Sequence, residues 1–198
     1  MTGSPSDLEQ RVAACRDRLS SVPGGARSPD GWLFARLVAA REVRGERALL
    51  GLSPSELAGL AARHFATNAL TVPSHESVAL LDEKQAAFAA AMRDFLIGLA
   101  ASETHAEDAR CLATILAHAC LRPDHLWRDL GLSGRDDVTQ MLTRFFPEVV
   151  ARNTQNLRWK KLLARELALS RGDVPGPAPG CPGCEDFGFC FPDRKHAN

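Results

Sequence analysis

The sequence of 198 residues has no tyrosine, and no apolar run approaches the roughly 20 residues that a membrane-spanning helix needs. Its polar N-terminal segment lacks the apolar centre of a secretory signal. Lysine plus arginine equals aspartate plus glutamate, at 24 each, so no net charge favours binding to nucleic acid or an anionic membrane. We therefore expect a cytoplasmic protein with no nucleic-acid or membrane partner.

Common catalytic motifs are also missing. The sequence has no glycine-rich phosphate loop, no H-E-x-x-H motif and no serine nucleophile elbow. No pair of carboxylates stands out for acid–base catalysis either. An ordinary hydrolase or kinase activity has no support, and we predict that the protein is not an enzyme.

Apolar residues recur at spacings of three and four through the first 170 positions, and clusters of β-branched residues are few. This pattern predicts an all-α fold, with a single multi-helix domain over residues 1–170. The segment that follows is rich in proline and glycine, where a helix cannot continue. We expect residues 171–198 to form an irregular, cysteine-rich, metal-binding tail.

Local signals place several of the helix boundaries. We expect helices over about 7–20, 31–45 and 75–101, and a last long helix from Pro147 to about Ser170. Three N-terminal caps are predicted, in which a serine or threonine is followed three residues later by an acidic residue. These pairs are Ser53 with Glu56, Thr104 with Glu107, and Ser133 with Asp136.

The tail carries the pattern Cys181-x2-Cys184-x5-Cys190. Two cysteines separated by two residues can turn both sulfurs toward one metal, and the third can return to the same centre from a loop. Cytoplasmic thiols stay mostly reduced, which favours metal binding over a disulfide. Zinc normally takes a fourth protein ligand, so three thiolates suit a cubane-type cluster better. A zinc site and unused thiols remain open alternatives.

The remaining cysteines and histidines have ordinary explanations. Cys111 and His118 share one face of an expected helix, but cysteine is among the most buried residue types, so core packing is favoured. Cys120 falls on the opposite side of that helix, and Cys15 is expected to be structural. A lone histidine such as His64 or His125 more often satisfies local backbone groups than binds a ligand.

A basic stripe is the second feature of interest. Arg158, Lys161 and Arg165 stand at i, i+3 and i+7 of the expected last helix, which leads directly into the cysteine tail. The stripe is either a solvated face or a contact for an anion or an acidic partner. It has too few aromatic neighbours to indicate nucleic-acid binding.

Residues 119–168, together with the cysteine tail, resemble the NifQ family of nitrogen-fixation proteins. A looser likeness covers residues 51–65, and the whole resemblance spans roughly residues 30–192. The strongest matches are DHLW at 124–127, DLGL at 129–132, RNT at 152–154 and RWKK at 158–161.

The resemblance implies a protein that carries molybdenum and iron in a molybdenum-containing iron–sulfur cluster. It implies that molybdate is the molybdenum source and that the cofactor scaffold NifEN and the iron protein NifH of nitrogenase are the recipients. The family signature is C-x4-C-x2-C-x5-C, and its last three cysteines map onto Cys181, Cys184 and Cys190. Its first cysteine falls on Gly176 in this sequence.

Loss of that cysteine leaves three possibilities. A cluster of three irons and one molybdenum needs only three thiolates for its irons, another group such as His125 completes the site, or this member has lost the activity. Our leading hypothesis is a molybdenum and iron–sulfur carrier for assembly of the iron–molybdenum cofactor. In this hypothesis Arg158, Lys161 and Arg165 contact molybdate or a partner. A zinc-stabilised interaction module and a member without metal are the alternatives.

Overall fold

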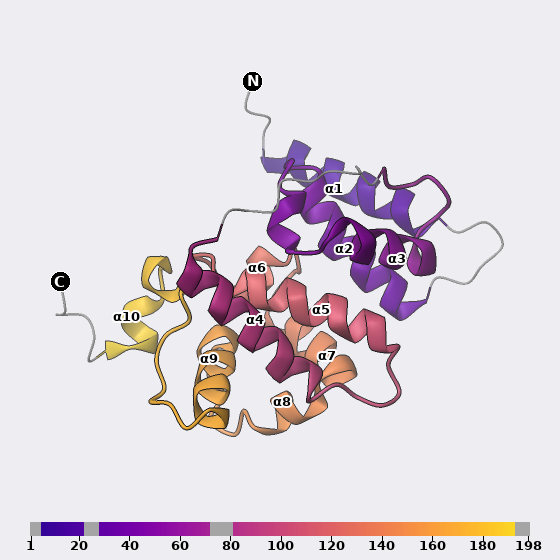
Figure 1. Cartoon of the computed structure of the whole chain (residues 1–198). Helices are drawn as coiled ribbons and strands as arrows, with labels where there is room; N and C mark the ends of the chain where they lie inside the picture. Colours follow the sequence, from indigo (N-terminus) through magenta and orange to yellow (C-terminus); the bar gives the residue numbers. More distant parts are fainter. Residues whose placement is uncertain (1–4, 22–27, 72–80, 193–198) are drawn as a thin grey trace. The chain divides into compact units, whose positions relative to one another are not determined.

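A computed structural model describes residues 5–21, 28–71 and 81–192 (Figure 1). Within these ranges every regular element is helical, which confirms the predicted all-α class. The elements are α1 Pro5–Ser20, α2 Pro29–Glu42, η1 Arg47–Leu50, α3 Pro54–His64, α4 Glu83–Ile97, α5 Ala106–Ala119, α6 Leu126–Asp129, α7 Arg135–Phe145, α8 Pro147–Ala151, α9 Trp159–Ser170, η2 Cys181–Gly183 and α10 Phe187–Cys190. No helix among the described residues is long and apolar enough to span a bilayer.

The chain divides into two compact units. The first comprises Met1–Leu80 with Leu130–Leu132, and the second comprises Leu81–Asp129 with Ser133–Asn198. A boundary at residue 170 between a helical domain and a tail therefore stays a prediction. The cysteine-rich segment belongs to the second unit, where it contains one 3-10 turn (η2) and one short helix (α10).

In the first unit, α1 packs along α2, and α2 also contacts α3 and η1. The fully buried Phe34, Leu37 and Leu57 belong to its core. The predicted cap of α3 is confirmed, because the Ser53 hydroxyl accepts from the Glu56 amide while the Glu56 carboxylate accepts from the Ser53 amide.

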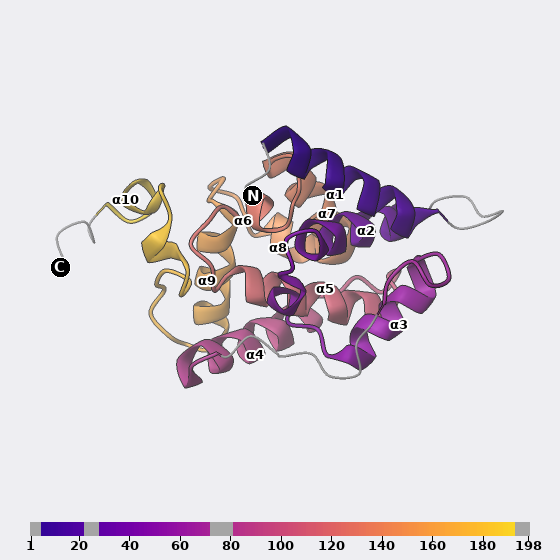
Figure 2. The ribbon, with the colours of Figure 1, turned by 90° about the horizontal axis from the view of Figure 1, so that it is seen from above.

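In the second unit, α4 packs along α5, as Figures 1 and 2 both show, and α9 also contacts α4. Met92, Leu116 and Leu163 lie in the interior of this unit. α4 begins at Glu83, and Asp82 and Gln85 form a capping box at its N-terminus. The part of the expected 75–101 helix before residue 81 lies outside the described residues.

Two of the predicted caps are wrong. The Nδ1 atom of His105 caps α5 by accepting from the Glu107 amide at 3.3 Å, while the Thr104 hydroxyl donates to the Ala101 carbonyl. Gly134, rather than Ser133, precedes α7, and the Ser133 amide donates to the Asp137 carboxylate. In both places a neighbouring group offers the backbone a competing hydrogen bond.

The predicted single helix from Pro147 to Ser170 is also wrong, because it is broken between α8 and α9. Asn156 adopts a left-handed backbone conformation with φ of 51°. The Asn153 side chain accepts from the Leu157 amide at 2.7 Å and donates to the Leu157 carbonyl at 3.0 Å, so it replaces bonds that a continuous helix would make. The break puts Arg158 at the N-terminus of α9 rather than in the middle of a helix.

Candidate functional site

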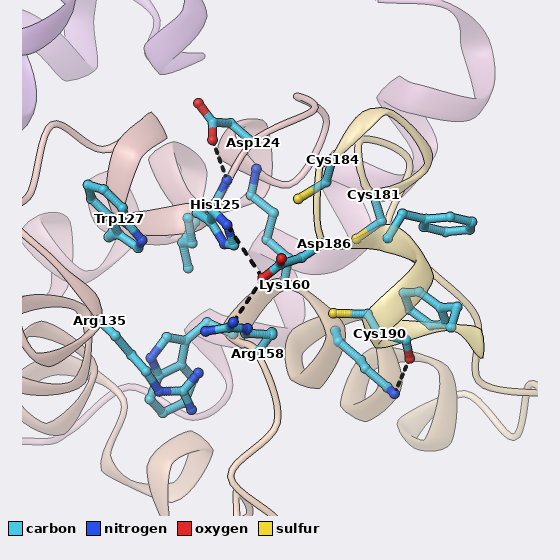
Figure 3. Close-up of a pocket in the computed structure, with 15 residues that line it drawn as sticks. Asp124, His125, Trp127, Arg135, Arg158, Lys160, Cys181, Cys184, Asp186 and Cys190 are labelled. Atoms are coloured by element: carbon cyan, nitrogen blue, oxygen red, sulfur yellow. Dashed lines mark hydrogen bonds and ion pairs between the residues drawn. The ribbon is translucent and has the colours of Figure 1, made fainter. Parts of the chain in front are cut away.

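The second unit contains a cavity of about 60 Å³, here called the cysteine pocket (Figure 3). Its wall is made by the residues before and within α6, the first turns of α7 and α9, and the cysteine-rich segment. The lining residues are Asp124, His125, Leu126, Trp127, Arg135, Arg158, Trp159, Lys160, Lys161, Cys181, Cys184, Asp186, Phe187, Cys190 and Phe191.

Two glycines fit the cysteine-rich segment closely against the end of α5. The Gly180 amide donates to the Cys120 carbonyl at 3.0 Å, and a Cβ atom on Gly180 would collide with the backbone carbonyl of Arg122. Gly183 similarly lies against the Pro123 side chain. Only a residue without a Cβ atom allows this close approach of two backbones.

All three predicted metal ligands line the cysteine pocket. Figure 3 shows Cys181, Cys184 and Cys190 on one side and His125 and Arg158 across from them. Cys181 is buried, and the other two are partly exposed. In residues 5–21, 28–71 and 81–192, no three His, Cys, Asp or Glu side chains are close enough to hold a metal ion as they stand.

Burial raises the pKa of the Cys181 and Cys190 thiols above the ordinary cysteine value. Both groups are therefore protonated thiols near neutral pH. Because metals bind the thiolate form, a metal bound by these two groups would displace their protons.

Gly176, which occupies the position of the first family cysteine, does not line the pocket. His125 is the imidazole that does. Its Nε2 lies 3.1 Å from the Glu185 carboxylate and 3.6 Å from that of Asp186, and its ring stacks with Trp127. Two acidic residues of the cysteine-rich segment thus hold this imidazole at the pocket.

Two of the three predicted basic residues also reach the pocket. Arg158 forms an ion pair of 2.8 Å with Asp186. The Lys161 ammonium donates to the Cys190 carbonyl at 2.5 Å and lies 4.9 Å from the centre of the Phe191 ring. Arg165 does not line the pocket, and its guanidinium pairs with Glu166 at 3.0 Å.

A buried charged network supports one side of the pocket. The Lys160 ammonium donates to the Arg122 carbonyl at 2.9 Å and pairs with Asp129, which also accepts from Arg122 at 2.8 Å. Burial alone would raise the pKa of Asp129, but the charges and hydrogen bonds of Lys160 and Arg122 lower it overall. The network ties α6 and α9 to the turn against which Gly180 packs.

Sequence reasoning missed two residues at the opposite end of the pocket. The Arg135 guanidinium lies 5.2 Å from the centre of the Trp159 ring and donates at 2.8 Å both to the Asn156 side chain and to the Leu157 carbonyl. The Trp159 Nε1 is buried and has no hydrogen-bond partner. Trp159 stands in the matched RWKK motif, whereas no sequence signal links Arg135 to it.

The other cysteines, and the described histidines besides His125, do not line the pocket. Cys111 and His118 are buried in α5, as core packing predicts. Cys120, directly after that helix, is also buried, and burial raises the pKa of its thiol to about 12. Cys15 is buried in the first unit, where His64 stacks against Phe34. None of the six cysteines is in a disulfide.

Comparison with known proteins gives a consistent answer. A family model described as NifQ matches residues 33–192. A protein NifQ homolog from Sinorhizobium fredii (strain NBRC 101917 / NGR234) is 37% identical over 141 residues, which cover 71% of this chain and 60% of that protein. Protein NifQ from Azotobacter vinelandii is 41% identical over 40% of this chain and 41% of its own length.

Protein NifQ from Klebsiella pneumoniae is 37% identical over 43% of this chain and 52% of its own length. The chain thus spans about half the length of the curated relatives that it matches. No solved structure matches it.

Proposed function

Because the chain belongs to the NifQ family, we propose that it carries molybdenum in an iron–sulfur cluster and supplies it for assembly of the iron–molybdenum cofactor of nitrogenase. One observation carries the proposal. Cys181, Cys184 and Cys190, which the family signature assigns to metal, line one pocket although eight residues lie between the first and the last. The role is carriage and donation of metal rather than turnover of a substrate.

The donor set fits such a cargo. Thiolates are the ligands that iron–sulfur clusters prefer, and a cubane takes one thiolate at each iron corner. The rings of Phe187 and Phe191 pack together at 5.3 Å beside the thiols and limit access of water. We propose that loading draws the three sulfurs toward the cargo, with the cysteine-rich segment adjusting around it.

The missing first cysteine leaves a coordination position to another group. We propose that His125 fills it, because its imidazole lines the same pocket as the three thiols. Neutral imidazole is a common ligand of iron in proteins. The carboxylates of Glu185 and Asp186 orient its ring, as outer partners of metal-binding histidines usually do.

The basic residues are assigned to the supply of molybdenum and its delivery. We propose that Arg158 and Lys161, at the pocket, contact molybdate, and that Arg165, outside it, contacts a partner. In this account the protein acts in the cytoplasm, and the recipients are the scaffold NifEN and the iron protein NifH. A guanidinium or ammonium group attracts both an oxyanion and an acidic protein surface.

The proposal is tested in a nitrogen-fixing host that lacks its own NifQ-family protein and grows on limiting molybdate. The wild-type chain is expected to restore molybdenum-dependent nitrogenase activity, and the triple variant Cys181→Ser, Cys184→Ser, Cys190→Ser is expected not to. Cys15→Ser, which alters a cysteine of the other unit, serves as the matched control. Full activity with the triple variant would show that these thiols carry no metal in the pathway.

A further inference from the structure

A second hollow adjoins the cysteine pocket and shares four of its lining residues. This basic hollow has a volume of about 490 Å³ and is lined by Arg135, Gln155, Asn156, Leu157, Arg158, Lys161, Phe189 and Cys190. Three of these described side chains are cationic and none is acidic. A concave surface lined by charge of one sign concentrates the opposite ion, so this hollow attracts anions.

Trp159, in the wall of the cysteine pocket beside Arg135, supplies an independent sign of a ligand. Its side chain is 6% exposed and lines the cysteine pocket, yet its indole N–H has no acceptor. A buried donor without a partner is costly, and native proteins rarely keep one unless a ligand or water satisfies it. An indole N–H donates and never accepts, so the group that satisfies it must be an acceptor.

Arg135 points to the same kind of ligand. Its guanidinium lies over the Trp159 ring, and among the described residues its hydrogen bonds go to a side-chain amide and a backbone carbonyl, with no ion pair. Burial and the nearby positive charge of Arg158 lower the pKa of Arg135. Of the two guanidinium groups only that of Arg158 has a carboxylate partner, Asp186. An anion between them relieves their repulsion.

We propose that the junction of the two hollows is a binding site for a tetrahedral oxyanion of charge −2, held by the indole N–H of Trp159 and the guanidinium of Arg135. Arg158 and Lys161 add positive charge along the entry through the basic hollow. The size is suitable, since about 60 Å³ holds roughly four to six water-sized groups, and such an anion presents four oxygens.

This site deepens the proposed function, because it lets molybdenum enter as an oxyanion beside the thiols. It is nevertheless separable from cluster binding. The site uses hydrogen-bond donors and fixed positive charge, whereas the cluster uses sulfur. A variant without the three cysteines should therefore keep the oxyanion and lose the cluster.

Titration calorimetry of the full metal-free chain with molybdate, tungstate and sulfate tests the site, with nitrate as a planar anion of single charge. The three dianions are expected to bind at one site per chain and nitrate at least tenfold more weakly. Trp159→Phe, which keeps the ring beneath Arg135 but removes the N–H, should weaken molybdate binding about tenfold or more. Arg135→Gln should do the same.

Matched controls make the result specific. Trp32 also carries an arginine over its ring, Arg16 at 4.4 Å, but it belongs to the first unit, so Trp32→Phe should leave binding unchanged. Arg93→Gln removes an exposed guanidinium of the second unit and should likewise have no effect. Asp186→Asn removes the carboxylate that competes for Arg158 and should tighten binding several-fold.

The outcomes separate this inference from the proposed function. Dianion binding that persists in the triple Cys→Ser variant supports the site, even if no cluster is formed by any variant. Loss of dianion binding in that variant would assign the anion to the thiols and overturn the site. Unchanged affinity in both Trp159→Phe and Arg135→Gln, or no binding by the wild type, would also overturn it, even if the wild type binds a cluster.

Discussion

Lys160 and Asp129, which are 31 residues apart in the sequence, form an ion pair with an Nζ–Oδ2 distance of 2.5 Å, and each side chain is more than nine-tenths buried. Arg122 joins the same carboxylate from a third position in the chain. The pair connects the start of α9 with α6, and both helices contribute to the wall of the cysteine pocket. The shape of the pocket therefore depends on charges that lie outside the predicted ligands.

Asp129→Asn is expected to lower the free energy of unfolding by about 3–5 kcal/mol, because it leaves the Lys160 ammonium buried without its countercharge. Urea unfolding at pH 7 measures this change. Asp173→Asn is the control, since it alters an exposed pair with Arg171 at 3.5 Å and should cost no more than about 1 kcal/mol. Equal losses of unfolding free energy in the two variants would show that the buried pair stabilises the fold no more than the exposed pair does.

The same pair predicts a pH dependence. The pKa of Asp129 is lowered in the folded state relative to the unfolded value of about 3.9, so its contribution is complete above that value and is lost as the pH falls through the folded-state pKa. The difference in unfolding free energy between wild type and Asp129→Asn should therefore persist from pH 7 to about pH 4 and shrink below it. A difference that already disappears near pH 6 contradicts the assignment.

Gly180→Ala should release the cysteine-rich segment from the end of α5. The added Cβ meets the Arg122 carbonyl, and overpacking of this kind costs about 1–3 kcal/mol. The buried Cys181 thiol should then react faster with an alkylating reagent in the reduced, metal-free protein. Gly134→Ala is the control, because it has extended backbone and no atom near the new Cβ, so Cys181 should react there at the wild-type rate.

Cys120 should resist alkylation in the native protein. It is fully buried, and burial raises its thiol pKa to about 12, so almost no thiolate forms at pH 8. Mass spectrometry after a short iodoacetamide treatment is expected to find the partly exposed Cys184 labelled and Cys120 unlabelled. In urea, both should react. Equal labelling of the two in the native state would contradict the described packing.

The sequence predicted features that depend on neighbours along the chain. The cap of α3 is an example, because serine, proline and glutamate at fixed spacing satisfy amides within one turn. The prediction of one helix from Pro147 failed because the Asn153 side chain forms hydrogen bonds at Leu157 in place of helical ones. The spacing of apolar residues does not reveal such a competition. Helix existence was thus easier to predict than helix boundaries.

Only part of the candidate site could be predicted from the sequence. The three thiols stand close together in the sequence, and their spacing and the family resemblance predicted them as ligands; the structure shows that they line one pocket. Arg135 lies over Trp159 only because the break before α9 brings residues 156 and 157 within reach of its guanidinium. Contacts of this kind come from tertiary packing, so the spacing of residues along the sequence does not predict them.

Quantification of metal and sulfide in the chain after anaerobic reconstitution with iron, sulfide and molybdate tests the central claim most directly. The wild type is expected to be brown and to retain iron, sulfide and molybdenum together. The triple Cys181→Ser, Cys184→Ser, Cys190→Ser variant is expected to retain no iron or sulfide, and to hold molybdenum only as exchangeable molybdate. A colourless wild-type protein that holds a single zinc ion, or equal iron and molybdenum in both proteins, would contradict the account.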